Sequence, residues 1–438
     1  MCARCLRGAT RAPLTFHPPI PAVTQSVLSK EFKNGLVLVA EPMGWLESAA
    51  FSLLVPAGCS RDPRDHAGLA NFCCEMVQRG AGNRNSRQFV EDLELLGADT
   101  SASVSNAHTS FGGAMPAESL NAVLGIYADV VRRPRLPADQ LEDGRLVCFQ
   151  EVRAVEDDLA QKVMYKLRET QYPDPYGRSP QGTMESVACM TLEDIRGFWQ
   201  TFYQPAGAIL SVAGKIDWGK LCQHVETLFG DWEPREIPEV KVTEPVRAYH
   251  HIEHSSTQTH IGISYDSVPY SDADYFQARG AVGVLSDGMS SRLFTEVREN
   301  RGLCYTVQAS CHSLKDRGSV ICYAGTTTER AQETVDVTLA ELRKIALGVE
   351  ADELNRLKAR IKSAIIMQQE SSPSRSSSIA ADWYYLGRVR TLKELGFLVD
   401  NLTCDSINAY LAAHPPRDFN IVTLGEKRLE TPVGISQS

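Results

Sequence analysis

The chain has 438 residues, of which 43% are hydrophobic and 23% are charged. This length predicts two or three domains, and the composition is typical of a globular protein rather than a disordered one. The formal net charge is −9 and no basic patch stands out, which argues against a nucleic-acid partner because phosphate backbones are held by clustered Lys and Arg.

Residues 1–29 are predicted to form an N-terminal arm. They contain Arg4, Arg7 and Arg11 and no acid, which is the charge bias of a mitochondrial transit peptide. Four prolines between positions 13 and 21 break any helix beyond the first turns, so a simple disordered arm is the favoured interpretation. We therefore expect a cytoplasmic location, with the mitochondrial matrix as the alternative. No secretory h-region is present, and no apolar run approaches the ~20 residues of a membrane span.

The twelve cysteines are irregularly spaced, and only Cys2 and Cys5 form a C-x-x-C pair. A second pair, which a structural zinc site of this kind needs, is missing. Free buried thiols in a reducing compartment are the favoured interpretation.

Residues 30–230 mix predicted strands and helices within one unit. Apolar or alternating runs predict strands at 37–40, 50–55, 100–106, 109–114 and 207–213. Helical signals predict helices at 86–96, 117–131 and 138–167, the last of them long and interrupted.

A linker is predicted at residues 231–247, because this stretch is rich in proline and charge. After it the order of signals repeats over residues 248–438, with strands at 260–265, 305–310 and 319–325 and helices at 273–285, 290–301 and 329–347. In each half a helix ended by a glycine, Gly97 or Gly302, runs into an alternating strand, a second strand and another helix. This weak internal repeat predicts a duplicated domain.

The most informative helix is predicted at residues 68–76, which read G-L-A-N-F-C-C-E-M. Its apolar residues recur at i, i+3, i+4 and i+7, so one face is buried while Asn71, Cys74 and Glu75 lie on other faces. The helix resembles the zinc helix of inverzincins of the pitrilysin and mitochondrial processing peptidase family, in which H-x-x-E-H supplies two zinc-binding His and a Glu base. Here Asn71 stands at the first His position, Cys74 at the Glu position and Glu75 at the second His position.

Three further segments carry the same resemblance. Glu151 lies 76 residues past Glu75, where the family has its third zinc ligand, and residues 175–182, P-Y-G-R-S-P-Q-G, match its P-x-G-R-x-x-x-G pattern. Residues 287–305 are similar to its C-terminal signature. The resemblance extends from about Lys30 to about Leu429.

The resemblance implies an α+β fold with two similar α/β half-domains of the LuxS/MPP-like type, joined by a linker and closing like a clamshell on a peptide chamber. Active members of the family contain four such units, in one chain or in a dimer. Because this chain has only two, the resemblance implies a partner subunit.

The residues at the degenerate positions do not make a self-contained zinc site. Catalytic zinc takes three protein ligands from His, Cys or carboxylate, whereas the amide of Asn71 is a poor donor and Glu75 with Glu151 would hold zinc weakly. Cys74 and Glu75 differ by about 100° around the helix and cannot easily face one ion. His66 precedes the helix in a turn typical of a surface His. We therefore predict no metal and no cofactor in this chain.

A second histidine cluster, H-H-I-E-H at residues 250–254, alternates like a strand. On a strand, His250 and His254 lie about 13 Å apart, which is too far for one ion. A solvated strand edge is therefore expected.

The second half retains a different piece of chemistry. Arg298 and Tyr305 resemble the family's Arg/Tyr pair, and Phe294 stands one turn earlier, at a position that lines the substrate pocket. An Arg at the end of a helix and a Tyr at the start of the next strand can converge across Gly302 and donate hydrogen bonds to a substrate carbonyl or its oxyanion. From spacing alone, a solvated Arg and a core Tyr would be favoured. The complete signature makes Arg298 and Tyr305 candidate catalytic residues and Phe294 a candidate substrate contact.

These features predict the zinc-less subunit of a heterodimeric zinc metallopeptidase, with an H-x-x-E-H-bearing homologue as partner and zinc in that partner. In this hypothesis the chain closes the chamber, binds extended peptide and acts through Arg298 and Tyr305 in trans. The alternative is a scaffold, as in the core subunits of the respiratory cytochrome bc1 complex. A homodimer with an unusual metal set is a third possibility.

Overall fold

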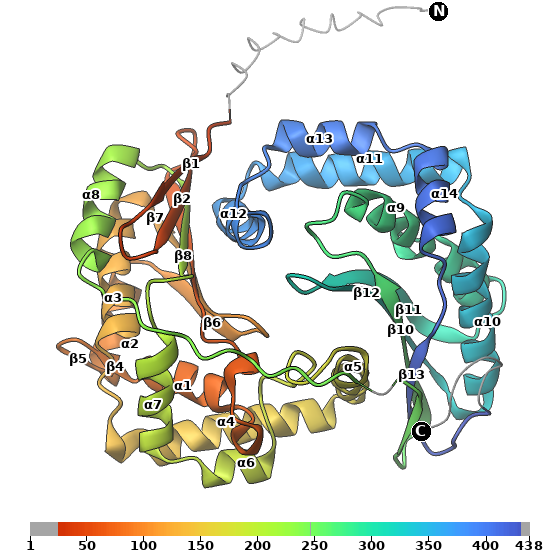
Figure 1. The fold of residues 1–438 in the computed structure, drawn as a ribbon, viewed down its shortest axis with the longest axis horizontal. Helices are drawn as coiled ribbons and strands as arrows, with labels where there is room; N and C mark the ends of the chain where they lie inside the picture. The colour runs from red at the N-terminus through yellow and green to blue at the C-terminus, as the bar shows by residue number, and fades with distance from the viewer. Residues whose placement is uncertain (1–24, 246, 431–438) are drawn as a thin grey trace, which may run out of the picture.

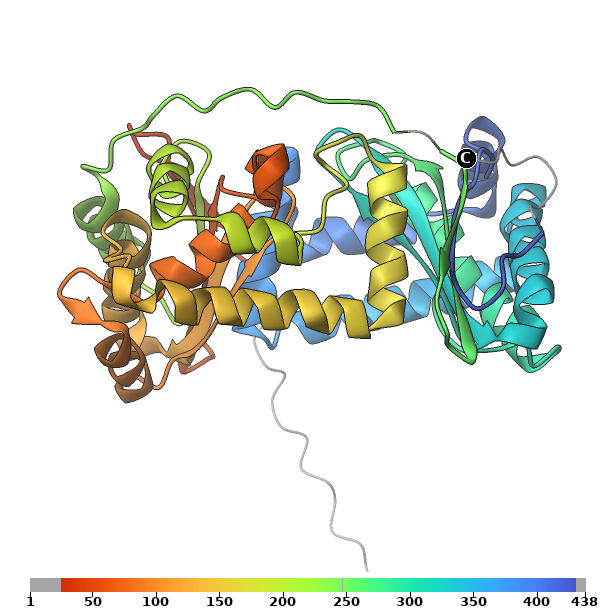
Figure 2. The ribbon, with the colours of Figure 1, turned by 90° about the horizontal axis from the view of Figure 1, so that it is seen from below.

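The computed structural model describes residues 25–245 and 247–430, which form two halves that face each other (Figure 1). Each half is built on one large β-sheet with most of its helices on the outer side, and the first half adds a short hairpin of β4 (Gly80–Ala81) and β5 (Arg84–Asn85). Viewed from below, an extended segment runs across both halves and joins them (Figure 2).

The first half contains a six-stranded sheet in the order β1-β2-β8-β3-β7-β6. These strands are β1 (Leu28–Glu31), β2 (Val37–Pro42), β8 (Ile209–Gly214), β3 (Ser48–Val55), β7 (Thr109–Pro116) and β6 (Asp99–Val104). The pair β2–β8 is parallel and the other neighbours are antiparallel. The helices of this half are α1 (Leu69–Val77), α2 (Ser86–Leu95), α3 (Leu120–Arg132), α4 (Leu141–Asp157), α5 (Leu159–Gln171), α6 (Met184–Cys189), α7 (Leu192–Phe202) and α8 (Trp218–Phe229). All of these helices except α5 pack over one face of the sheet, and together with it they enclose one large apolar core.

The second half contains a five-stranded sheet in the order β11-β12-β10-β13-β9. These strands are β11 (Cys304–Ser313), β12 (Gly318–Thr327), β10 (Gln258–Ser267), β13 (Asn420–Gly425) and β9 (Tyr249–Glu253). The helices are α9 (Tyr275–Ser286), α10 (Ala331–Lys344), α11 (Ala351–Gln368), α12 (Ser372–Leu386), α13 (Leu392–Asp400) and α14 (Cys404–Ala413). A separate apolar core lies between this sheet and its outer helices.

The two halves exchange helices. From the first half, α5 packs on the inner face of the second sheet, where Val163 and Leu167 contact Val422. Gly262 permits this approach, because a Cβ there would lie 3.0 Å from a methyl of Val163. In return α12 packs on the first sheet through Ile379. Each inner sheet face is therefore covered by a helix from the other half.

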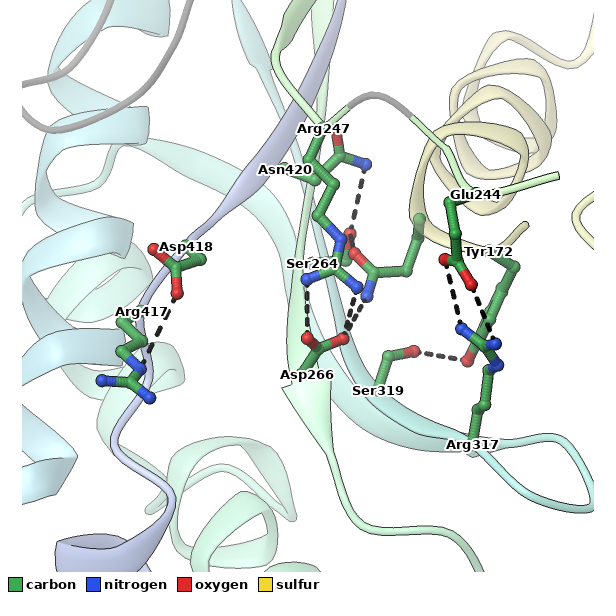
Figure 3. Close-up of polar contacts among 11 residues, drawn as sticks. Tyr172, Glu244, Arg247, Ser264, Asp266, Arg317, Ser319, Arg417, Asp418 and Asn420 are labelled. Carbon is green, nitrogen blue, oxygen red and sulfur yellow. Dashed lines mark hydrogen bonds and ion pairs between the residues drawn. The ribbon is translucent and has the colours of Figure 1, made fainter.

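The predicted linker is extended and is tied to both halves. Arg61 of the first half donates to the carbonyl of Pro238 at 2.7 Å. Figure 3 shows the other end, where Glu244 pairs with Arg317 at 3.1 Å. Arg247 donates to both carboxylate oxygens of Asp266 on β10, at 2.6 and 2.7 Å. These contacts attach the segment to the second sheet.

The prediction of two similar α/β halves is confirmed, and most of the predicted strands and helices are present. The long helix predicted at 138–167 is interrupted as expected, because Asp158 caps a new helix by accepting a hydrogen bond from Gln161 N. The prediction of an α-helix at 290–301 is wrong, because residues Phe294–Glu299 form a π-helix instead. The predicted domain boundaries stay predictions, although β1 already begins at Leu28, inside the predicted arm.

In the described parts of the chain, no helix combines the length and the hydropathy needed to cross a bilayer. The cysteines that fall there are free thiols, several of them buried. Cys2, Cys5 and most of the predicted arm lie outside the described residues.

One contact between the halves should make the stability of the protein sensitive to acid. The buried ring of His108 meets the ring of Tyr384 on α12 edge-on, with centroids 4.3 Å apart. Burial, helped by the positive charge of Lys315, lowers the pKa of His108 to about 4. Since this value lies below that of an unfolded His, the stabilisation is complete above about pH 6.5 and is lost as the pH falls toward 4.

When the pH falls from 7 to 5, we expect the free energy of unfolding to decrease by roughly 2 kcal/mol more in the wild type than in His108→Gln. Urea unfolding of the two proteins at both pH values measures this difference. His414→Gln, at an exposed position, is the matched control and should leave the loss unchanged. The same pH dependence in wild type and His108→Gln would contradict the prediction.

Candidate functional site

The degenerate zinc helix is α1, and a buried carboxylate fixes where it begins. Asp62 accepts hydrogen bonds from the backbone N–H groups of Gly68 and Ala70, each at 2.8 Å. These donors belong to the first turn, which has no partners within the helix. Burial raises the pKa of Asp62 to about 7.

The segment 175–182 packs against the same end of α1. Gly182 has φ +70°, and a Cβ at this position would lie 1.9 Å from the carbonyl oxygen of Ala67. Arg178 donates to both carboxylate oxygens of Asp174, at 2.6 and 2.7 Å, and to the carbonyl oxygen of Asp62 at 2.8 Å. This motif, which sequence reasoning used only as a sign of resemblance, therefore positions the helix.

The structure places Asn71 next to Glu151. This is expected if both residues stand at positions where the family has zinc ligands. The Asn71 amide donates to a Glu151 carboxylate oxygen at 2.5 Å, from α1 to α4. An amide N–H thus lies against a carboxylate that could otherwise bind a metal.

Glu75, the third degenerate position on α1, is also paired. Arg79, one turn later on the same helix, donates through Nε to Glu75 Oε1 at 2.9 Å and approaches it through Nη2 at 2.7 Å. Both side chains are largely buried. An internal guanidinium therefore supplies positive charge beside this carboxylate.

The thiols near these residues are poor metal ligands. The prediction that Cys74 lies away from the buried part of α1 is wrong, because α4 packs against this helix as well and Cys74 is buried. Desolvation raises its pKa well above the ordinary value, with nearby acidic groups adding to the effect. The same causes raise the pKa of Cys148 to about 12. Metal binding requires the thiolate, which both sites disfavour. Across the described residues, no three or more His, Cys, Asp and Glu side chains are grouped to hold a metal ion. The residues present do not fit a catalytic zinc.

The histidines weighed from the sequence lie elsewhere. His66 ends a short 3-10 turn and contacts the acids Asp65 and Asp194, at 3.1 and 3.9 Å. Residues 250–254 lie on and just after β9, an edge strand as predicted. There His251 is half-buried and its Nδ1 lies 2.9 Å from the hydroxyl of Thr423.

In the second half, Phe294, Arg298 and Tyr305 form one cluster. The Arg298 guanidinium lies over the ring of Phe294, 4.7 Å from its centroid, and over that of Tyr305, 5.3 Å from its centroid. Arg298 is thus held between two aromatic rings by cation–π contacts. The predicted convergence of these side chains is present in the structure.

Two irregularities of the backbone build this cluster. The segment Phe294–Glu299 is π-helical, and the N–H of Asn300 bonds to the carbonyl of Thr295, five residues back. At the start of β11 the register with β12 shifts between Cys304 and Thr306, so Tyr305 is an extra, unpaired residue. π-helical turns and bulges are common where a fold directs side chains toward a functional site.

Tyr305 is 83% exposed, which is unusual for a large aromatic residue in a strand. The core position considered for Tyr305 is therefore wrong. Its hydroxyl and the edge of the Arg298 guanidinium can donate hydrogen bonds to a carbonyl oxygen of an arriving molecule. The cluster and α1 lie in opposite halves of the chain (Figure 1).

Sequence reasoning missed two residues of the degenerate site. Arg79 follows Glu75 by four residues, the spacing at which helical side chains of opposite charge meet. Cys148 lies three residues before Glu151 on α4, and its sulfur is 4.0 Å from the Asn71 amide nitrogen. Both spacings are visible in the sequence, but neither residue stands at a position of the family's zinc ligands.

Two family models match the chain. Residues 45–183, which include α1 and Glu151, match the model described as insulinase (peptidase family M16). Residues 190–361, which include Arg298 and Tyr305, match the peptidase M16 inactive domain.

Relatives and solved structures agree with these matches. Uncharacterized zinc proteases of Bacillus subtilis and Mycobacterium bovis are 26% and 25% identical, covering 83% and 93% of this chain and 89% and 95% of their own lengths. A peptidase M16 inactive domain from Pseudomonas fluorescens superposes with a TM-score of 0.82 at 21% identity, over 93% of this chain and 99% of that one. A chain of complex III2 from Candida albicans gives 0.78 at 16% identity, over 92% and 96%.

Proposed function

The chain belongs to the peptidase M16 family, and we propose that it is a zinc-less subunit of a heterodimeric zinc peptidase. In this role it forms part of the chamber wall and binds the peptide substrate. The partner is a homologue with an intact H-x-x-E-H motif. That this chain has no zinc of its own, and its cytoplasmic or mitochondrial matrix location, stay predictions.

The contrast between the two candidate sites carries the proposal. At the degenerate site, Asn71 and Arg79 hold the two carboxylates in internal contacts. At the other, Arg298 and Tyr305 are arranged together with the Tyr almost fully exposed. A chain that had lost all contact with substrate would have no need of an exposed Tyr on a bulge beside an Arg.

The Arg298/Tyr305 cluster suits the binding of a peptide carbonyl. Stacking between two rings restricts the guanidinium while its N–H edge stays available, so little conformational entropy is lost on binding. The hydroxyl of Tyr305 supplies a neutral donor nearby. Donors that converge on one oxygen bind it more strongly as negative charge develops there, and this is how the chain would assist hydrolysis in its partner.

A scaffold role is the second candidate. It is favoured by the likeness to a chain of complex III2 from Candida albicans, which extends over 92% of this chain. In that role the fold would be retained for assembly, and the Arg298/Tyr305 cluster would have no effect on any turnover.

An affinity pull-down of the tagged chain from its native cells tests the proposal. Recovery of a homologue bearing H-x-x-E-H in equal amount is the expected result. Respiratory-complex subunits would indicate the scaffold, and recovery of the chain alone would direct attention to a homodimer. Peptidase activity of the co-purified pair, with metal analysis of each subunit, completes the test.

Tyr305→Phe should reduce kcat of the assembled pair about tenfold, because one hydrogen bond to the reacting carbonyl is lost. Assembly should be unchanged, since only an exposed hydroxyl is removed. Steady-state kinetics and size-exclusion chromatography of the pair measure the two effects.

Thr306→Ala is the matched control for this substitution. It removes a hydroxyl from the adjacent exposed residue, which is paired with Gly325 of β12 and does not belong to the cluster of Phe294, Arg298 and Tyr305. Equal kcat values for wild type and Tyr305→Phe would contradict a role for Tyr305 in turnover.

A further inference from the structure

A cavity of about 500 Å³ lies between the two halves, where the exchanged helices α5 and α12 cover the sheets. Its walls come from the inner face of the first sheet, α5 and the segment after it, the β11–β12 turn and α12. Arg298 and Tyr305 do not line it, and neither do the residues of the degenerate zinc helix.

The charged lining of this cavity has one sign. Arg168, Arg178 and Lys315 line it, and none of the described lining residues is Asp or Glu. This is unexpected in a chain whose net charge is −9. A cavity lined by one sign of charge concentrates ions of the opposite sign.

Two of these cations have no carboxylate partner. Arg178 is bound to Asp174 and holds the start of α1, so it belongs to the framework. Arg168 and Lys315, by contrast, form no ion pair with any carboxylate in residues 25–245 or 247–430. Arg168 stacks on the ring of Tyr165, and its buried Nε has no hydrogen-bond partner. Because Nε is enclosed by protein, an anion in the cavity would be bound by the terminal nitrogens of the guanidinium.

Hydroxyl groups complete the donor set. On β6, Ala102 packs toward the core, so Ser101 and Ser103 point into the cavity from the opposite face. Ser377 of α12 lines the facing wall, whereas the hydroxyl of Tyr385 already donates to the carbonyl oxygen of Ser313 at 3.0 Å. The serine hydroxyls can donate hydrogen bonds to those oxygens of a bound anion that the two cations do not contact.

Two histidines in the lining are consistent with a positive potential. Burial and the nearby Arg168 lower the pKa of His312 to about 4, and burial and Lys315 lower that of His108 to a similar value. Both rings are therefore neutral near pH 7, and the fixed charge of the cavity comes from the arginine and lysine side chains.

We propose that this cavity binds a carboxylate of a peptide, with Arg168 and Lys315 as its charged donors. The carboxylate belongs either to an acidic side chain or to the C-terminus. The choice of a peptide rests on the proposed function, whereas the choice of a carboxylate rests on the cavity itself. The chain thus gives the chamber a preference for acidic peptide segments.

Fluorescence anisotropy with the full-length chain alone tests this proposal. The probes are labelled hexapeptides of Ala and Ser, acetylated at the N-terminus, with a central Glu or Gln and an amidated or free C-terminus. We expect the amidated Glu peptide or the free-acid Gln peptide to bind about tenfold more tightly than the amidated Gln peptide. The two arms distinguish a side-chain carboxylate from a terminal one.

Arg168→Gln and Lys315→Gln should each remove most of this preference. Lys315 is exposed, so its substitution leaves the fold intact even if Arg168→Gln does not fold. Lys166→Gln, on the same helix but outside the cavity, is the matched control and should bind like wild type.

Equal affinity for all peptides, or a preference that survives Lys315→Gln, would overturn the proposal. Binding of inorganic phosphate without binding of any acidic peptide would contradict the proposal that the ligand is a peptide. These outcomes leave the pull-down and the Tyr305→Phe result untouched, so failure here is distinguishable from failure of the proposed function.

Discussion

Asn71→His combined with Glu75→His should turn this chain into a zinc-binding protein. The two positions lie one turn apart on α1, and Glu151 already lies 2.5 Å from the side chain at position 71. Two His and one carboxylate form a common catalytic zinc ligand set. Both substitutions replace partly buried polar side chains, so the apolar face of α1 is not disturbed.

The expected gain in zinc affinity is at least about 1000-fold, because two strong neutral nitrogen ligands replace a weak amide donor and a carboxylate held by Arg79. Isothermal titration with zinc, and metal analysis after dialysis, measure it. Cys74 stands at the position of the base, so the variant should bind zinc without hydrolysing peptides.

Glu151→Gln in the same double variant is the control, since it removes the charged third ligand and should weaken zinc binding strongly. Zinc binding of equal strength with and without Glu151 would show that the two histidines bind the ion at some other place. Failure of the double variant to bind zinc at all would contradict the equivalence of these positions to metal ligands.

The sequence allowed the individual elements of the fold to be predicted better than their packing. Alternation in β6 and β7 and the Gly-ended helix α2 follow from local patterns, and the structure has them. The exchange of α5 and α12 does not, because helical periodicity identifies an apolar face without identifying the sheet that covers it. Nothing local in α12 indicates that Ile379 meets the first sheet.

For the candidate sites too, the sequence predicted local features better than three-dimensional arrangement. The resemblance to the family's C-terminal signature paired Arg298 with Tyr305, and the structure brings them together. The π-helix and the bulge that expose Tyr305 were missed, because both depend on hydrogen-bond registers that a residue pattern does not encode. The acid-free cavity was missed for a related reason: Arg168 and Lys315 are far apart in sequence and meet only through the helix exchange.

Glu41→Gln or Arg375→Met should destabilise the protein by about 3–5 kcal/mol, because each leaves its partner charge buried and unpaired. Arg375 on α12 donates to Glu41 on β2 through Nε at 2.9 Å and Nη2 at 2.7 Å. The two side chains are only 1% and 3% exposed. Gln25 also donates to Glu41, at 3.0 Å. Because Glu41 belongs to the first half and Arg375 to the second, their ion pair joins the two halves near the start of the first sheet.

Urea unfolding measures this loss, and limited proteolysis within α12 should accelerate with it. Arg388→Met is the matched control: Arg388 follows α12 and pairs with Glu394 in a bridge that is 58% and 33% exposed, so its loss should cost less than about 1 kcal/mol. Replacing both Glu41 and Arg375 by Met should recover much of the stability, because two apolar side chains leave no buried charge. If the double variant were as unstable as the single ones, the pair would stabilise the helix exchange by its shape rather than by its charge.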